Sequence, residues 1–90
     1  MFDSIKSTLE ERSKTHGDFT ENAEIMQQLK YVCHLSPNWK NNKLSVVQQE
    51  AIDMICHKLG RILAGDPNHA DHWLDVQGYA RCAWERLHRQ

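Results

Sequence analysis

Side chains that could bind a metal or a phosphate recur at helical spacing in the second half of the chain. Separations of three, four and four residues place them on one face of an α-helix: Glu50, Asp53, His57 and Arg61. The acids come first, and the bases, which include Lys58, come last. Divalent cations prefer carboxylate ligands, whereas phosphate oxygens prefer cationic donors. The stripe therefore predicts a site for a metal-bound phosphate, and the alternative is a solvated face of ordinary charge pairs.

Further carboxylates lie on the next helical segment. Asp71 and Asp75 share one side of that segment with Gly78. A glycine inside a helix costs about 1 kcal/mol relative to alanine, so Gly60 and Gly78 indicate that a backbone or a ligand approaches closely. The two aspartates could supply ligands to the same site from a neighbouring helix.

The tripeptide His16-Gly17-Asp18 admits two interpretations. In the first, Gly17 makes a turn and Asp18 caps the helix that follows, which would occupy the backbone amides there. In the second, the segment binds an anion, and His16 and Arg12 are then better phosphate contacts than the turn itself.

Other chemistry is less well supported by the spacing of the residues. The histidines and cysteines do not form paired zinc ligands, and no activating partner marks a cysteine nucleophile. Cys33, Cys56 and Cys82 are therefore predicted to be reduced, packed thiols. Among the aromatic residues, Trp73 and Trp84 are predicted to lie in the core, and Trp39 and Tyr79 to reach a ligand.

Four helices must position these side chains. The first runs from about residue 3 to residue 14, the second opens at a capping box formed by Asp18 and Glu21, and the polar segment 36–44 is a loop. The third helix opens at a second capping box, Ser45 and Gln48, and closes at residues 65–67. Asn68 or Asp71 caps the last helix, which continues to residue 87. No run alternates as a β-strand does.

Size and charge narrow the class of protein. The 90 residues form one domain, 1–90, with 40% hydrophobic and 26% charged residues and a formal net charge of −1. A near-neutral chain has no general attraction for nucleic acid. We expect no secretory signal and no membrane span, and hence a cytoplasmic protein. The prediction is an all-α, compact bundle of about four helices, and because its core is small we expect homo-oligomerisation to complete it.

Several motifs resemble those of a family of short, uncharacterised phage and prophage helical proteins. They are Arg-x-x-x-His-Gly-Asp, Glu-x-x-Asp-Met-Ile-x-His-Lys-x-x-Arg-Ile and Asp-His-Trp-x-Asp-x-x-Gly-Tyr-Ala, and they span about residues 12–83. More distantly, the chain resembles MazG-type all-α nucleotide pyrophosphohydrolases and nucleotide-modification-associated domains. Glu50 and Asp53 match the Glu-x-x-Asp half of the MazG signature. Its Glu-Glu-x-x-Glu half is not matched at Glu10-Glu11, because the position that should hold the third glutamate is Lys14.

This resemblance implies a protein that handles nucleotides, in the host cytoplasm if it is phage-encoded. In one form, magnesium bound by four acids promotes hydrolysis of the nucleotide: Glu50, Asp53, Asp71 and Asp75. In the other form, the protein is a non-catalytic sponge that sequesters a nucleotide or a cyclic-nucleotide immune signal and so counters host defence. Both forms use the same candidate contacts to the nucleotide and its phosphates: Arg12, His16, His57, Lys58, Arg61, Trp39 and Tyr79. A protein–protein interaction module is the third alternative, and whether the protein is an enzyme stays open.

Overall fold

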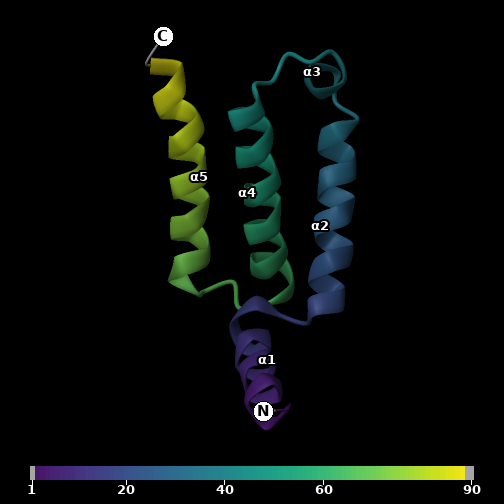
Figure 1. The fold of residues 1–90 in the computed structure, drawn as a ribbon, viewed down its shortest axis with the longest axis vertical. Coiled ribbons are helices and arrows are strands. Elements are labelled where there is room, and N and C mark those ends of the chain that lie inside the picture. Colours follow the sequence, from purple (N-terminus) through teal and green to yellow (C-terminus); the bar gives the residue numbers. More distant parts are fainter. Residues whose placement is uncertain (1, 89–90) are drawn as a thin grey trace.

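The computed structural model describes residues 2–88 and shows an all-α chain (Figure 1). Its helices are α1 (Phe2–His16), α2 (Phe19–His34), α3 (Pro37–Lys40), α4 (Val46–Ala64) and α5 (Ala70–His88). The described residues form no β-strand. The all-α class that the sequence predicts is therefore confirmed, with four long helices and one short one.

The long helices α2, α4 and α5 lie side by side, and α4 occupies the middle position (Figure 1). Neighbours in this layer run in opposite directions, and α1 extends from the end at which α2 and α5 begin. The molecule measures 49 × 26 × 26 Å, with a radius of gyration of 15.4 Å. Apart from the contact of α1 with α4, the described residues leave the two broad faces of α4 without a covering helix.

The predicted capping residues begin two of the long helices. The Asp18 carboxylate accepts a hydrogen bond from the Glu21 amide at 3.1 Å. Ser45 and Gln48 form a reciprocal capping box, with bonds of 3.1 and 2.9 Å between each side chain and the other residue's amide. These bonds satisfy amides that the first turn of a helix leaves without partners. Both starts are confirmed.

The structure corrects two boundaries. The segment predicted as a loop contains the short helix α3, because Ser36 caps it and Pro37 occupies its first turn, where a missing amide costs nothing. The last helix begins at Ala70, so Asp71 lies within its first turn instead of preceding it. A carboxylate in that position still interacts favourably with the positive end of the helix dipole.

Few residues are fully buried. The buried apolar residues are Ala51, Cys56 and Ile62, all on α4, and the buried polar residues are Asn22, Lys58 and His72. The tryptophans predicted to lie in the core do not lie there: Trp73 is 52% exposed and Trp84 is 56% exposed. Both belong to α5, an outer helix of the layer, and none of the helices described above covers their side of it.

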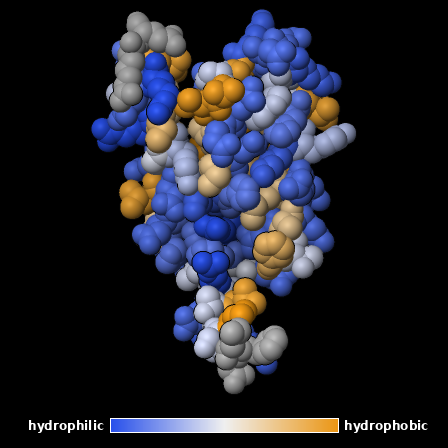
Figure 2. Space-filling model, viewed as in Figure 1, coloured by the Kyte–Doolittle hydropathy of each residue, from blue (hydrophilic) through white to orange (hydrophobic). Residues whose placement is uncertain are grey.

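The two faces of the layer differ in polarity. Hydrophilic side chains cover most of the face shown in Figure 2. Helical phase turns Glu50 and Arg61 toward this face, because Cys56 on one flank of α4 contacts α2 and Lys58 on the other contacts α5. We call it the polar face and the opposite one the apolar face. Within residues 2–88, no helix is long and apolar enough to cross a membrane.

Candidate functional site: a cationic hollow beside the α1–α2 turn

A hollow of about 510 Å³ opens where α1, the α1–α2 turn, α2 and α4 meet. Four of the predicted phosphate contacts line it: Arg12, His16, His57 and Arg61. They come from α1 and α4, which are far apart in the sequence. The rest of the wall is polar near the turn and apolar at Leu9, Phe19 and Met26. The structure therefore brings most of the basic candidates to one concave surface.

The α1–α2 turn is held tightly against the end of α4. Gly17 has φ +85°, a conformation that L side chains rarely adopt, and a Cβ there would lie 2.5 Å from the Ala64 carbonyl oxygen. The Thr15 carbonyl accepts hydrogen bonds from the Asp66 amide and from His72 Nε2, both at 2.9 Å. These contacts fix the position of His16 and explain the glycine in the motif.

Asn22 forms the buried part of the wall and was not among the predicted contacts. Its side chain is on the α4-facing side of α2, and the residue is 4% exposed. The amide nitrogen donates to the carbonyls of His16 and, at 3.0 Å, Asp18. Its Oδ1 is buried and accepts no hydrogen bond from any described residue. An asparagine on the core side of a predicted helix was the sequence signal for this residue.

The hollow carries a positive potential. Desolvation by burial is the largest cause that lowers the pKa of His16, and Arg61, His72, Arg12 and Lys58 lower it further. Several cations crowd one imidazole, so protonating it is unfavourable. Asp18 is the single acid among the lining residues, and its carboxylate caps α2.

A lysine that the sequence did not single out contacts His57. Lys30 Nζ on α2 donates to His57 Nε2 at 2.9 Å. Desolvation by burial, then the charges of Lys30 and Arg61, lower the pKa of His57, and Asp53 opposes them. Lys30 therefore adds a fifth basic group beside the hollow, one helix away from Arg61.

Lys58 lies outside the hollow. It is 9% exposed, and its Nζ is 3.0 Å from Asp75 Oδ2 on α5. The pair joins a predicted phosphate contact to a predicted magnesium ligand. In this structure the two residues form an ion pair between α4 and α5.

The structure does not bring the four predicted magnesium ligands together. Asp53 lies toward α2, where His34 Nε2 donates to its Oδ1 at 3.1 Å, whereas Asp75 lies toward Lys58 on the other flank of α4. Glu50 is in the first turns of α4 and Asp71 in the first turn of α5, and these antiparallel helices begin at opposite ends of the layer (Figure 1). Among residues 2–88, no group of three or more histidine, cysteine or acidic side chains is arranged to hold a metal ion.

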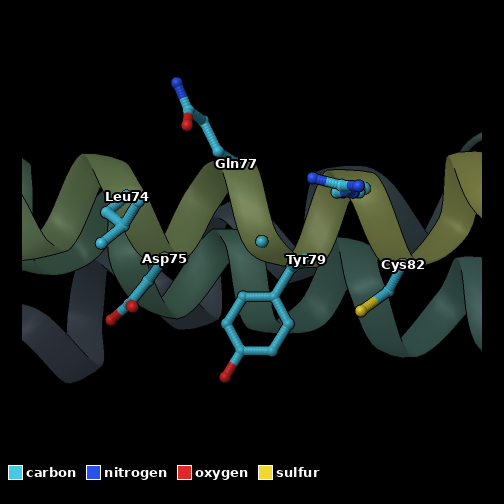
Figure 3. A pocket seen from close by; sticks show the side chains of 7 residues that line it. Leu74, Asp75, Gln77, Tyr79 and Cys82 are labelled. Atoms are coloured by element: carbon cyan, nitrogen blue, oxygen red, sulfur yellow. The ribbon is translucent and has the colours of Figure 1, made fainter.

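The two predicted aromatic contacts lie elsewhere. Trp39 on α3 stacks on the His34 ring, with centroids 4.1 Å apart, at the end of α2 remote from the hollow. Tyr79 lines a shallow groove of about 430 Å³ along α5 (Figure 3). Its walls come from α5 alone, and it exists because Gly78 has no side chain and nothing within 4 Å of the place where one would be. The groove brings no basic group from α4 to Tyr79.

Three histidines meet beside the hollow. The ring centroids of His16 and His72 are 5.1 Å apart, and those of His69 and His72 are 4.6 Å apart. His69 and His72 are three residues apart, so the sequence alone predicts that they are neighbours. The contact of His72 with His16 depends on the α1–α2 turn. Because His72 is 2% exposed and donates to a carbonyl, it supports the turn.

The sequence profile of the family described as "Domain of unknown function (DUF6378)" matches residues 2–87. The chain belongs to the DUF6378 family. The match includes the hollow, the Lys58–Asp75 pair and every helix described above. The description of DUF6378 assigns no activity to these features. No match was found among curated proteins or solved structures.

Proposed function

We propose that this DUF6378 protein binds nucleotides through their phosphates in the hollow beside the α1–α2 turn. The observation that carries the proposal is the convergence of Arg12 and Arg61, from two helices, on a hollow that also contains two imidazoles, whose pKa values are lowered chiefly by burial. Guanidinium groups bind phosphate oxygens in bidentate fashion. Desolvation by burial is the largest cause of the lowered pKa of both histidines, and a bound polyanion would offset the further lowering by the neighbouring cations.

The dimensions and wall of the hollow support a nucleotide over a bare anion. A volume of about 510 Å³ lies within the range of small-molecule sites. Phe19, which is 83% exposed, and Leu9, which is 61% exposed, stand at the same hollow as the arginines. An aromatic side chain next to cationic groups suits a base attached to a phosphate.

Binding without hydrolysis is the leading form of the proposal, because the basic side chains meet at one hollow and the predicted acidic ligands are spread along the layer. This form corresponds to sequestration of a nucleotide or a cyclic-nucleotide signal. The cytoplasmic location, the phage relationship and the distant resemblance to MazG-type enzymes stay predictions from the sequence.

Magnesium-dependent hydrolysis is the second candidate. Asp53 lies one helical turn before His57 on α4, and its side chain is 28% exposed. A magnesium ion bound there would lie next to a phosphate held at His57. The predicted homo-oligomer is compatible with this site, because the hollow opens on the polar face and leaves the apolar face free for a partner.

A thermal-shift panel tests the proposal. Nucleoside mono-, di- and triphosphates and cyclic dinucleotides are each added with and without magnesium, and inorganic sulfate serves as an anion without a base. A ligand at 100 times its Kd should stabilise the folded state by about 2.7 kcal/mol. Stabilisation that does not need magnesium favours sequestration, and product formation with magnesium favours hydrolysis. If no member of the panel raises the melting temperature, the charged stripe is a solvated or partner-facing surface and the proposal is wrong.

A further inference from the structure

The chain exposes more surface than a compact monomer of its size. Its accessible surface is 6878 Å², whereas monomers of 10.5 kDa expose about 5,400 Å². Its radius of gyration of 15.4 Å also exceeds the value of about 12 Å for 90 compact residues. The protruding α1 and the open layer of three helices both contribute to the excess (Figure 1).

The excess surface includes large apolar side chains on the apolar face. Helical phase directs five exposed residues of this kind to it: Val32, Leu63, Trp73, Trp84 and Leu87. Half-buried residues continue the same face inward: Ile52 and Leu59 on α4, and Val76 on α5. An extended apolar surface of this kind marks an interaction site.

The spacing on α4 and α5 is that of helices that pack against further helices. Apolar residues on α5 follow each other by three, four, four and three positions: Trp73, Val76, Ala80, Trp84 and Leu87. On α4, Leu59 follows Ile52 by seven positions, and Leu63 follows Leu59 by four. Alternation of three and four is the pattern of bundle and coiled-coil seams. The named positions on these two helices carry no charge.

We infer that this apolar face is covered by a second copy of the chain, with α4 and α5 of each copy packed together in a four-helix bundle around a two-fold axis. A two-fold interface brings a surface onto itself, so the surface must be self-complementary. An uncharged face meets this requirement, because self-pairing creates no like-charge contact. A standard interface buries about 800 Å² per partner, and the excess over a compact monomer, to which this face and α1 both contribute, is larger than that. The inference does not depend on nucleotide binding.

Two leucines of nearly equal exposure provide a matched test. Leu63, on the apolar face, is 63% exposed, and Leu74, on the outer edge of α5, is 61% exposed (Figure 3). The masses of the wild type, Leu63→Glu and Leu74→Glu are measured by sedimentation equilibrium without ligand. We expect wild type and Leu74→Glu to be dimers at 50 µM, and Leu63→Glu to dissociate at least tenfold more readily. A monomeric wild type, or a dimer that only Leu74→Glu disrupts, would overturn the inference.

A second measurement needs no variant and so remains informative if Leu63→Glu does not fold. Trp73 and Trp84 are half-exposed in one chain and become covered in the dimer. Quenching of tryptophan fluorescence by acrylamide should therefore weaken as the wild-type concentration rises through the dimerisation range. Quenching that stays constant while the mass doubles would show that another face forms the dimer. Both measurements are made without ligand, so their results do not depend on whether the nucleotide proposal is correct.

Discussion

Lys58 and Asp75 form an ion pair, with Nζ 3.0 Å from Oδ2, that joins the middle helix of the layer to α5. The lysine side chain is 11% exposed and the aspartate side chain 44% exposed. Taking a charge out of water is unfavourable unless a partner compensates it. Removal of either partner should therefore destabilise the fold. Separate roles of Lys58 in phosphate binding and of Asp75 in metal binding would not predict this loss of stability.

Asp75→Asn should destabilise the protein. The substitution leaves the buried Lys58 charge without its carboxylate, which costs about 3–5 kcal/mol in a fully buried pair. Water reaches Asp75, so we expect about 1–3 kcal/mol, measured by urea denaturation. Asp71→Asn is the control, because the Asp71 side chain is 76% exposed, and it should change stability by less than about 0.5 kcal/mol. Lys58→Met added to Asp75→Asn should recover stability, and no recovery would contradict the stated cause.

Arg61 should contribute directly to ligand affinity. Its guanidinium can bind phosphate through two donors, whereas lysine offers a point charge, so Arg61→Lys should weaken binding and Arg61→Ala should weaken it more. Loss of a charged hydrogen bond is worth about 1.5–3 kcal/mol, or about ten- to over a hundredfold in Kd. Calorimetric titration with the strongest ligand of the panel measures this. Arg81→Ala is the control, since Arg81 lies on α5 away from the hollow, and equal losses in both variants would remove Arg61 from the site.

The stability of the free protein should fall as the pH is lowered below 6.5. The folded-state pKa values of His16 and His57 are below their ordinary value of 6.5, so the unfolded chain binds protons at a higher pH than the folded chain does. The free energy of unfolding contributed by these groups is fully present above pH 6.5 and decreases as the pH falls through the lowered pKa values. Urea denaturation between pH 5 and 8 measures the slope. His16→Gln with His57→Gln should flatten it, and an unchanged slope would assign the effect to other groups.

Anion binding should respond to pH in the opposite direction. A bound anion raises the pKa of a neighbouring imidazole, so binding takes up protons and the affinity should increase as the pH falls from 8 to 6. Sulfate is the suitable probe, because its own charge does not change in this range. Calorimetry in buffers of different ionisation enthalpy measures the proton uptake directly. An affinity for sulfate that does not vary with pH would place the anion away from both histidines.

Gly17→Ala should destabilise the α1–α2 turn. The φ of +85° is unfavourable for alanine, and its Cβ would meet the Ala64 carbonyl at 2.5 Å, so we expect a loss above about 1 kcal/mol. Gly78→Ala is the matched control, because a Cβ there meets nothing within 4 Å and the helix propensity improves by about 0.5–1 kcal/mol. Thermal unfolding should therefore shift in opposite directions for the two variants. A loss of stability in Gly78→Ala would show that a partner packs against that edge.

The three cysteines should react at different rates. Cys82 is exposed, whereas Cys56 is buried beside Cys33, with the sulfurs 4.0 Å apart. Desolvation by burial, with Cys33, raises the pKa of Cys56 to about 11, and the thiolate is the reactive form. Ellman's reagent at pH 8 should therefore modify Cys82 first and Cys56 last. Mass spectrometry of the partly modified protein identifies the order, and early modification of Cys56 would contradict the buried thiol pair.

The sequence by itself determined the elements and the class of the fold. Hydrophobic periodicity predicted the long helices, and local hydrogen bonding at Asp18 and Ser45 predicted where two of them begin. These are interactions between residues three or four apart, so they can be derived from the chain alone. The same reasoning failed at α3, where four residues form a helix too short to show periodicity. It also failed at Trp73 and Trp84, whose side of α5 is not covered by any helix within residues 2–88.

Only the tertiary structure decided which of the candidate residues meet. Periodicity places Asp53, Lys58 and Arg61 on one helix, but it does not state which neighbour each of them faces. Because α4 lies between two helices, Asp53 pairs toward α2 and Lys58 toward α5, while Arg61 turns to the polar face and joins Arg12. That meeting depends on the Gly17 turn and its contact with the end of α4, which joins residues about fifty positions apart. Contacts between distant segments depend on how the helices pack, and this packing cannot be predicted from the spacing of residues within one helix.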